Sequence, residues 1–185
     1  MDNDKNKSSI FAITKNLTLT CFISGIILAC VYYITAPVAA QKQVQIKNDT
    51  MKVLVKNADN FKPVNGKKDW YSAQKGSKTI AYIVPAASKG YGGAINMLVA
   101  VTPDGKVIDF NIVSHNETPG LGSNASEDSF RGQFKDKKAG DLTVTKDKSN
   151  KKNIQAMTGA TITSRAVTKG VQEAAQQVTT FTGGK

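Results

Sequence analysis

Cysteine is nearly absent from this 185-residue sequence, and both cysteines lie near its start. Cys21 and Cys30 stand nine residues apart in an apolar stretch, so on one helix they would point to opposite faces and could not form an internal disulfide. No cysteine follows residue 41. This absence excludes a thiolate-ligated iron–sulfur cluster within the chain, and it suits an extracytoplasmic domain.

Histidine occurs only once, as His115, so the sequence offers no cluster of histidines and cysteines that would predict a metal site. Ser123 and Glu117 stand too close to His115 in sequence to indicate a catalytic triad. No Gly-x-Gly-x-x-Gly fingerprint follows any predicted strand, which disfavours a doubly wound nucleotide-binding fold. We therefore expect no metal and no catalytic side chain on this chain.

A concentrated basic stripe is also missing, although the formal net charge is +11. The lysines are scattered, and no nucleic-acid-binding module accompanies them, so we expect no nucleic-acid partner. A basic surface facing anionic lipid or an acidic partner subunit is the favoured interpretation. Simple solubility is the alternative.

Charged residues are absent from Asn16 to Gln41, and the apolar centre runs from Leu17 to Ala36. About 20 apolar residues suffice for a helix to cross the hydrocarbon layer, and Tyr32 and Tyr33 suit an interfacial position. The sequence therefore predicts a tail over 1–15 and a transmembrane helix over 16–37. Small residues after Ala36 would also suit a cleaved signal peptide, but the apolar region is too long for that class.

The segment 38–60 is predicted to form an amphipathic linker helix. One face gathers apolar residues and the other carries lysines. The apolar positions are Val44, Met51, Leu54, Val55 and Ala58. This helix would either stand as a stalk between membrane and domain or pack on the core of the domain.

The middle of the sequence predicts antiparallel hairpins. Trp70–Ala73 and Thr79–Val84 flank one turn, and Met97–Val101 and Val107–Val113 flank the turn signal Thr102–Lys106. Phe130 and Phe134, four residues apart, fit a short helix with buried rings. With helices expected at both ends of the sheet, the fold class is α+β: one transmembrane helix followed by one domain over 61–185.

A hydroxyl-rich stretch, Met157–Ser164, precedes the last helical pattern of the chain. Apolar residues then recur at three- and four-residue steps, at Val167, Val171, Ala174, Ala175, Val178 and Phe181. Thr161 is thus expected at a helix N-terminus, where unpaired amides and the helix dipole favour a phosphate. The alternative is that these hydroxyls only cap the helix.

Two motifs carry a resemblance to a known family. Thr158-Gly159-Ala160-Thr161 resembles the flavinylation motif of the FMN-binding domain family, and His115-Asn116-Glu117-Thr118-Pro119-Gly120-Leu121-Gly122 resembles a second loop of that family. The resemblance implies FMN attached through a phosphoester to the last threonine, Thr161. Many members have an acidic residue where this chain has Gln155. This difference bears on how well the flavin transferase would recognise the site.

The resemblance also implies which residues surround the cofactor. Besides Thr161, the motif contributes Thr158, Gly159, Ala160 and Thr163. The loop His115–Gly122 would form a wall of the pocket, with His115, Glu117, Thr118, Gly120 and Leu121 as candidates, and Tyr91 would lie beside Gly90–Gly93. From the residues alone, His115–Gly122 could equally be a surface loop, and Gly90–Gly93 could equally be a flexible turn.

The presence of both motifs behind a membrane anchor resembles the G subunits of Rnf electron-transport complexes. The related C subunits of sodium-pumping NADH:quinone reductases are the next most similar group. The resemblance implies an electron-relay subunit of a ferredoxin:NAD oxidoreductase complex that exports sodium or protons. Its partners would be the other Rnf subunits, the flavin transferase and the lipid bilayer. Lysines before and after the span nearly balance, so the short tail and the resemblance together predict a cytoplasmic N-terminus and an extracytoplasmic FMN domain.

Two other functions stay open at this point. The chain could be a cofactor-free, membrane-anchored binding or assembly module whose threonines cap a helix. It could also be an independent FMN-carrying reductase that passes electrons to an external acceptor.

Overall fold

The computed structural model describes residues 2–147 and 149–183. Met1, Lys148 and 184–185, which belong to the predicted tail and the predicted FMN-binding domain, lie outside the described residues. The chain divides into two compact units, Met1–Lys47 and Asn48–Lys185. The division falls within the predicted linker segment 38–60.

Helix α1 runs without interruption from Asp2 to Leu54 and contains Pro37. The sequence predicts one helix before Pro37 and another after it, whereas the structure joins both into one. Proline removes a single backbone donor and usually kinks a helix, but it does not have to end one. The helical part of the linker segment ends at Leu54 and a turn follows.

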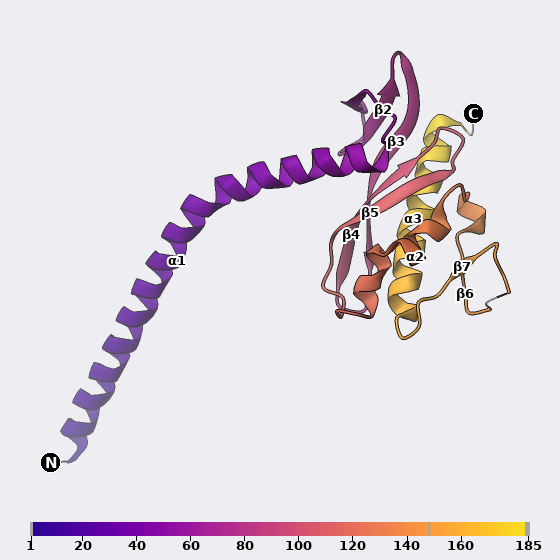
Figure 1. Ribbon diagram of the computed structural model, residues 1–185. Helices are drawn as coiled ribbons and strands as arrows, with labels where there is room; N and C mark the ends of the chain where they lie inside the picture. The colour runs from indigo at the N-terminus through magenta and orange to yellow at the C-terminus, as the bar shows by residue number, and fades with distance from the viewer. Residues whose placement is uncertain (1, 148, 184–185) are drawn as a thin grey trace. The chain divides into compact units, whose positions relative to one another are not determined.

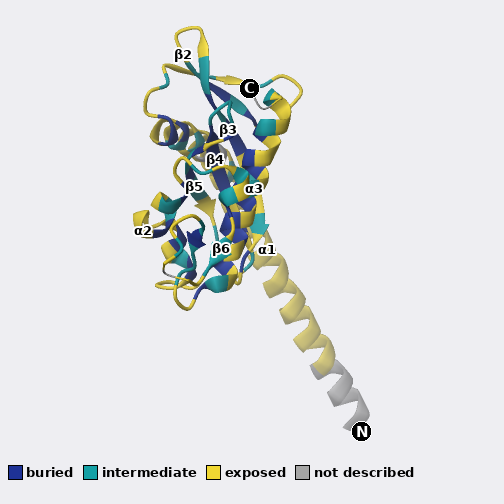
Figure 2. Ribbon diagram, turned by 90° about the vertical axis from the view of Figure 1, so that its right-hand side faces the viewer, coloured by how far each residue is buried: buried dark blue, intermediate teal, exposed yellow. Residues whose placement is uncertain are grey.

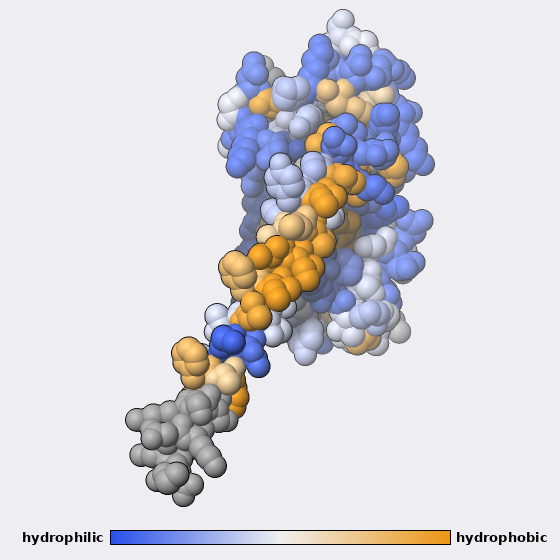
Figure 3. Space-filling model, turned by 90° about the vertical axis from the view of Figure 1, so that its left-hand side faces the viewer, coloured by the Kyte–Doolittle hydropathy of each residue, from blue (hydrophilic) through white to orange (hydrophobic). Residues whose placement is uncertain are grey.

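Large apolar side chains of the first unit are exposed along the length of α1, including Phe11, Phe22, Ile27, Leu28 and Ile34. Figure 3 shows them as a band of hydrophobic side chains along the helix. The helix is long and apolar enough to cross a membrane. An apolar surface of this extent would be unfavourable in water, so it is consistent with membrane anchoring.

The second unit is built on a five-stranded antiparallel sheet in the order β1-β2-β3-β4-β5. The strands are β1 (Asn60–Pro63), β2 (Tyr71–Lys75), β3 (Lys78–Lys89), β4 (Ala94–Val101) and β5 (Val107–Ser114). Each strand pairs with its neighbour in sequence, as short hairpin connections require. Both predicted hairpins and the α+β class are therefore confirmed (Figure 1).

Helices cover both faces of this sheet. Helix α3 (Thr161–Thr182) packs on one face, where its buried residues Val167, Val171 and Val178 meet Val99 and Phe110. Figure 2 shows the buried side of α3 turned towards the strands.

The last turn of α1 covers part of the other face. Met51, Leu54 and Val55 are buried there against Ile83 and Leu98. Of the two alternatives for the linker segment, its final part packs on the core of the domain.

The segment between β5 and α3 forms short elements. They are the 3₁₀ helices η1 (Gly122–Ser126), η2 (Gly132–Phe134) and η3 (Ala139–Asp141), helix α2 (Asp128–Arg131), and the strands β6 (Val144–Thr145) and β7 (Ile154–Gln155). Phe130 and Phe134 are buried in the main core, as predicted, and their rings lie 5.3 Å apart. The strands β6 and β7 pair in parallel, a pairing that the sequence pattern does not predict.

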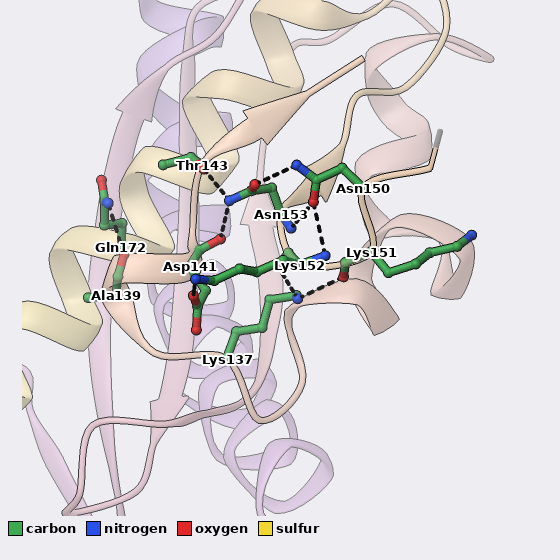
Figure 4. Close-up of polar contacts among 9 residues, drawn as sticks. All are labelled: Lys137, Ala139, Asp141, Thr143, Asn150, Lys151, Lys152, Asn153 and Gln172. Atoms are coloured by element: carbon green, nitrogen blue, oxygen red, sulfur yellow. Dashed lines mark hydrogen bonds and ion pairs between the residues drawn. The ribbon is translucent and has the colours of Figure 1, made fainter. Parts of the chain in front are cut away.

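Polar side chains hold this segment together (Figure 4). Asn153 donates to the Asp141 carbonyl at 3.2 Å and to the Thr143 hydroxyl, and Asn150 donates to the Asn153 side-chain oxygen at 2.8 Å. Gln172 of α3 donates to the Ala139 carbonyl at 2.9 Å. The segment leading to the motif at 157–164 is thereby anchored on α3.

Candidate functional site

A cavity of about 510 Å³ opens at the N-terminal end of α3. Three segments that are distant in sequence form its wall: the turn between β3 and β4, the loop after β5, and the first residues of α3 with those just before them. The lining residues are Tyr91, Glu117, Thr118, Leu121, Gly122, Gly159, Ala160, Thr161, Ile162 and Thr163. Both sequence motifs therefore meet in one place.

The start of α3 leaves backbone donors unpaired. Gly159 has a φ of +75°, a conformation that glycine adopts without strain, and Ala160 follows as the N-cap residue. No side chain caps the helix. Within the described part of the chain, the amides of Thr161, Ile162 and Thr163 donate to no acceptor. Capping by the hydroxyls, the alternative to a phosphate site, is therefore not what the structure contains.

The hydroxyl groups near this helix start differ sharply in their surroundings. Ser164 is fully buried, donating to the Ala160 carbonyl at 2.8 Å and accepting from the Met157 amide at 3.0 Å. Thr163, 2% exposed, donates to Glu117 Oε2 at 2.5 Å. Thr158 is exposed and does not line the cavity.

Thr161 is the remaining hydroxyl of the stretch. It is half-buried and lines the cavity, and its hydroxyl has no hydrogen-bond partner among the described residues. It thus combines access from the cavity with freedom to react.

Glu117 is held where the three segments of the cavity wall meet. One carboxylate oxygen accepts the Gly92 amide hydrogen at 3.0 Å and the other accepts the Thr163 hydroxyl. Its own amide donates to His115 Nδ1 at 3.1 Å. Only 7% of Glu117 is exposed.

Three glycines make room for this arrangement. A Cβ atom at Gly90 or Gly122 would collide with the Glu117 carboxylate, and one at Gly92 would collide with the Asn116 carbonyl. Gly90 and Gly92 do not line the cavity. The sequence leaves open whether these glycines allow close approach to a ligand or form a flexible turn. In the structure, their backbone closely approaches Asn116 and Glu117 of the loop after β5.

Eight of the predicted site residues come together in the cavity wall: Tyr91, Glu117, Thr118, Leu121, Gly159, Ala160, Thr161 and Thr163. His115, Gly120 and Thr158 do not line it. His115 instead supports the Glu117 amide, and Gly120, with a φ of +75°, forms the turn that Ser123 and Asn124 close by hydrogen bonds.

Two lining residues, Gly122 and Ile162, were not among the predicted site residues. Gly122 is the last residue of the quoted loop motif, and Ile162 directly follows Thr161. Ile162 is 56% exposed, Leu121 45% and Tyr91 70%. These three exposed apolar side chains gather at one cavity, and this clustering in the structure identifies Ile162, which no sequence pattern singles out.

Gln155 has a structural role at the position where the resembled family often has an acid. Its side-chain nitrogen donates to the Asp147 carbonyl at 2.6 Å and to the Asn150 carbonyl at 2.7 Å. A carboxylate only accepts hydrogen bonds and could not replace it in these contacts.

Ionisable groups with shifted pKa values lie elsewhere. Hydrogen bonds from the Ser149 hydroxyl and amide lower the pKa of Asp147, and the Thr102 hydroxyl, followed by Lys106, lowers that of Asp104. Among the described residues no group of three or more His, Cys, Asp or Glu could hold a metal ion. The cavity instead offers unpaired amides, one open hydroxyl and an apolar rim, which suit a ligand that joins a phosphate to a flat apolar group.

Comparison with known proteins agrees with this chemistry. Residues 90–176, which include every residue lining the cavity, match the FMN-binding domain family. The chain is 82% identical over 185 residues to the G subunit of the proton-translocating ferredoxin:NAD(+) oxidoreductase complex of Clostridium ljungdahlii, with 100% of each chain covered. It is 30% identical to the G subunit of the Na(+)-translocating ferredoxin:NAD(+) oxidoreductase complex of Acetobacterium woodii, covering 86% of this chain and 89% of that protein.

Two solved structures share the fold. NqrC of Shewanella oneidensis aligns with a TM-score of 0.52 at 20% identity, over 71% of this chain and 74% of that one. The C subunit of the Na(+)-translocating NADH-quinone reductase of Parabacteroides distasonis aligns with a TM-score of 0.50 at 22% identity, over 61% of each chain. At these identities the likeness concerns the fold alone.

Proposed function

Because this chain belongs to the G subunits of ion-translocating oxidoreductase complexes and contains an FMN-binding domain, we propose that it is an electron relay with FMN bound covalently to Thr161. The complex is a membrane-bound ferredoxin:NAD oxidoreductase that exports sodium or protons. This subunit would bind neither NAD nor ferredoxin itself.

The observation that carries the proposal is the difference between the hydroxyls at the start of α3. Thr163 and Ser164 are buried and already donate to protein acceptors, and Thr158 lies outside the cavity. Thr161 alone among them has a hydroxyl that lines the cavity without a partner in the described chain. A phosphoester at Thr161 would therefore form without breaking an internal hydrogen bond.

The neighbouring backbone suits the phosphate of this ester. The unpaired amides of Thr161, Ile162 and Thr163 can donate to phosphate oxygens, and the positive end of the α3 dipole favours the negative charge. A flavin transferase would bring the flavin donor. Thr161 Oγ1 would lose its proton and bond to the donor's phosphorus, while the bond from that phosphorus to the donor's leaving group breaks and the leaving group departs with the proton. The apolar rim of Tyr91, Leu121 and Ile162 would border the ring and restrict water.

When bound, FMN supplies the ability to accept and pass on one or two electrons. The protein's part is to hold and position it. A permanent tether keeps the flavin at its pocket at a high effective concentration, so that nothing has to rebind in each cycle. The apolar α1 would anchor the domain to the bilayer beside the other subunits, with the N-terminus in the cytoplasm and the FMN domain outside.

Attachment can be tested in cells that make the full chain together with a flavin transferase. Mass spectrometry of the peptide containing Thr161 should reveal the added mass of FMN, and the denatured protein should fluoresce in a gel. Thr161→Ala should abolish both signals, whereas Thr158→Ala should keep them. Fluorescence that survives in Thr161→Ala would place the ester on another hydroxyl, and an unmodified wild-type peptide would favour the cofactor-free module.

The relay function has its own test. The tagged, flavin-loaded chain should co-purify with several membrane-spanning proteins from mild detergent, and the Thr161→Ala complex should assemble but lose ferredoxin:NAD oxidoreductase activity. A flavin-loaded chain that purifies alone and reduces an external acceptor would instead support an independent reductase.

A further inference from the structure

Glu117 is the only buried charged residue among those whose burial the structure describes. Burying a carboxylate is costly unless it is paired or well hydrogen-bonded. No lysine, arginine or histidine within the described residues forms an ion pair with it. The charge is therefore balanced only by neutral donors.

Both oxygens of Glu117 accept hydrogen bonds, from the Gly92 amide at 3.0 Å and from the Thr163 hydroxyl at 2.5 Å. An ionised carboxylate only accepts hydrogen bonds, and both the Gly92 amide and the Thr163 hydroxyl can donate to it. Gly90 and Gly122 lack the Cβ atoms that would collide with the carboxylate. Its place is thus fixed from three segments, and it lines the cavity together with Thr161.

We propose that Glu117 is a positioning residue that also places an unpaired negative charge in the wall of the flavin cavity, where it lowers the reduction potential of the FMN. This inference rests on the proposed function and adds a role for one residue to it. A fixed negative charge repels incoming electrons, and the repulsion is stronger in a cavity with little water than in bulk solvent.

Two substitutions separate charge from structure. Glu117→Gln removes the charge but keeps the shape, because its amide oxygen can accept from Gly92 and its amide nitrogen can donate to the Thr163 oxygen. Thr163→Val keeps the charge but removes one of its two neutral donors. The first change should shift the FMN potential to more positive values and the second to more negative values.

The measurement is a redox titration of the full, flavin-loaded chain in detergent at alkaline pH, after mass spectrometry has confirmed the covalent FMN. The matched control is Glu127→Gln, which removes a carboxylate that is exposed and does not line the cavity. This control should leave the potential unchanged. General loosening of the cavity would move both Glu117→Gln and Thr163→Val in the same direction, so opposite shifts are specific to the charge.

The outcomes distinguish this inference from the function it rests on. Wild-type protein without FMN would overturn both. Covalent FMN with equal potentials in wild type and Glu117→Gln, or shifts of the same sign in Glu117→Gln and Thr163→Val, would overturn the role of Glu117 and leave the relay function standing. If Glu117→Gln fails to take up flavin, the FMN potential of Thr163→Val alone decides the question. A more negative potential than in the wild type supports the role of the Glu117 charge, and an unchanged or more positive potential contradicts it.

Discussion

The two ends of helix α3 are built in opposite ways. At its C-terminal end, Thr182 donates to the Pro103 carbonyl at 2.9 Å, and the amide of Gly183, a residue in a left-handed conformation, donates to the Thr179 carbonyl. The Phe181 ring lies 5.6 Å from both Trp70 and Tyr82. The N-terminal end has no side-chain cap and opens into the cavity.

This difference indicates which end serves stability and which serves binding. Unpaired helix donors cost free energy unless water, a side chain or a ligand satisfies them, so proteins usually cap them. Threonines occur at both ends of α3, yet at the open end they face the core or the cavity instead of capping. The chain thus completes one end itself and leaves the other to the phosphate of the proposed ligand.

Gly122→Ala should have the largest effect, at the open end. The new Cβ would collide with the Glu117 carboxylate and lie 2.8 Å from the Thr163 hydroxyl. Overpacking of this kind destabilises a fold by about 1–3 kcal/mol, and displacement of Glu117 would disorganise the cavity. We expect a lower thermal midpoint and several-fold less covalent flavin, measured by unfolding in detergent and by mass spectrometry.

The matched control is Gly132→Ala. Gly132 has ordinary helical backbone angles and open space where its Cβ would be, so alanine should be neutral or slightly stabilising there. Full flavin loading in Gly122→Ala would mean that the tie through Glu117 is not needed to form the site.

Phe181→Ala should weaken the closed end and leave the open end intact. The ring is 42% exposed but makes edge-on contacts with two aromatic rings. Losing these contacts should cost about 1–2 kcal/mol of the free energy of unfolding. Flavin content should stay at the wild-type level, and the near-ultraviolet signal of Trp70 should change. A parallel loss of flavin would contradict the separation between the two ends.

Sequence patterns predicted the parts of the fold that repeat a period over many residues. The alternation of apolar and polar residues in β5 and the apolar face of α3 extend far enough to be recognised. The pair β6–β7 has two residues in each strand, too few to show any period, and it depends on contacts such as that of Asn153 with Thr143. The continuity of α1 through Pro37 was missed because proline usually marks a boundary.

The sequence motifs predicted most of the residues of the candidate site but not the contacts between them. The two quoted motifs supply seven of the ten lining residues, and Ile162 and Thr163 directly follow one of them. Gly122 and Ile162 were nevertheless not among the predicted site residues. The sequence could not reveal that Glu117 bonds Gly92 and Thr163, because these contacts join residues 25 and 46 positions apart. The roles of His115 and Gly120 behind the wall likewise depend on three-dimensional placement.

Thr182→Val should have a smaller effect on the closed end. It removes the hydroxyl that lies 2.9 Å from the Pro103 carbonyl oxygen in the β4–β5 turn and 3.0 Å from the Val178 carbonyl oxygen of α3, and that can donate to either. A lost hydrogen bond of this type costs about 1 kcal/mol. The control is Thr180→Val, at a position without a side-chain hydrogen bond in the described chain, where we expect a change within about 0.5 kcal/mol. Equal midpoints for both variants would show that this hydrogen bond does not stabilise the closed end.

Asp104→Asn should have the smallest effect, and its effect should depend on pH. Asp104 stands in the turn that receives Thr182, and the Thr102 hydroxyl, then Lys106 at 3.0 Å, lower its pKa below the ordinary value of 3.8. A carboxyl whose pKa is lower in the folded state stabilises the fold above its unfolded pKa, and this stabilisation disappears as the pH falls through the folded pKa. Because the side chain is 43% exposed, the effect should stay below about 1 kcal/mol. Thermal midpoints of wild type and variant should therefore differ near neutral pH and converge as the pH falls below 3.8. A difference that does not depend on pH would show that the charge of Asp104 does not stabilise the closed end.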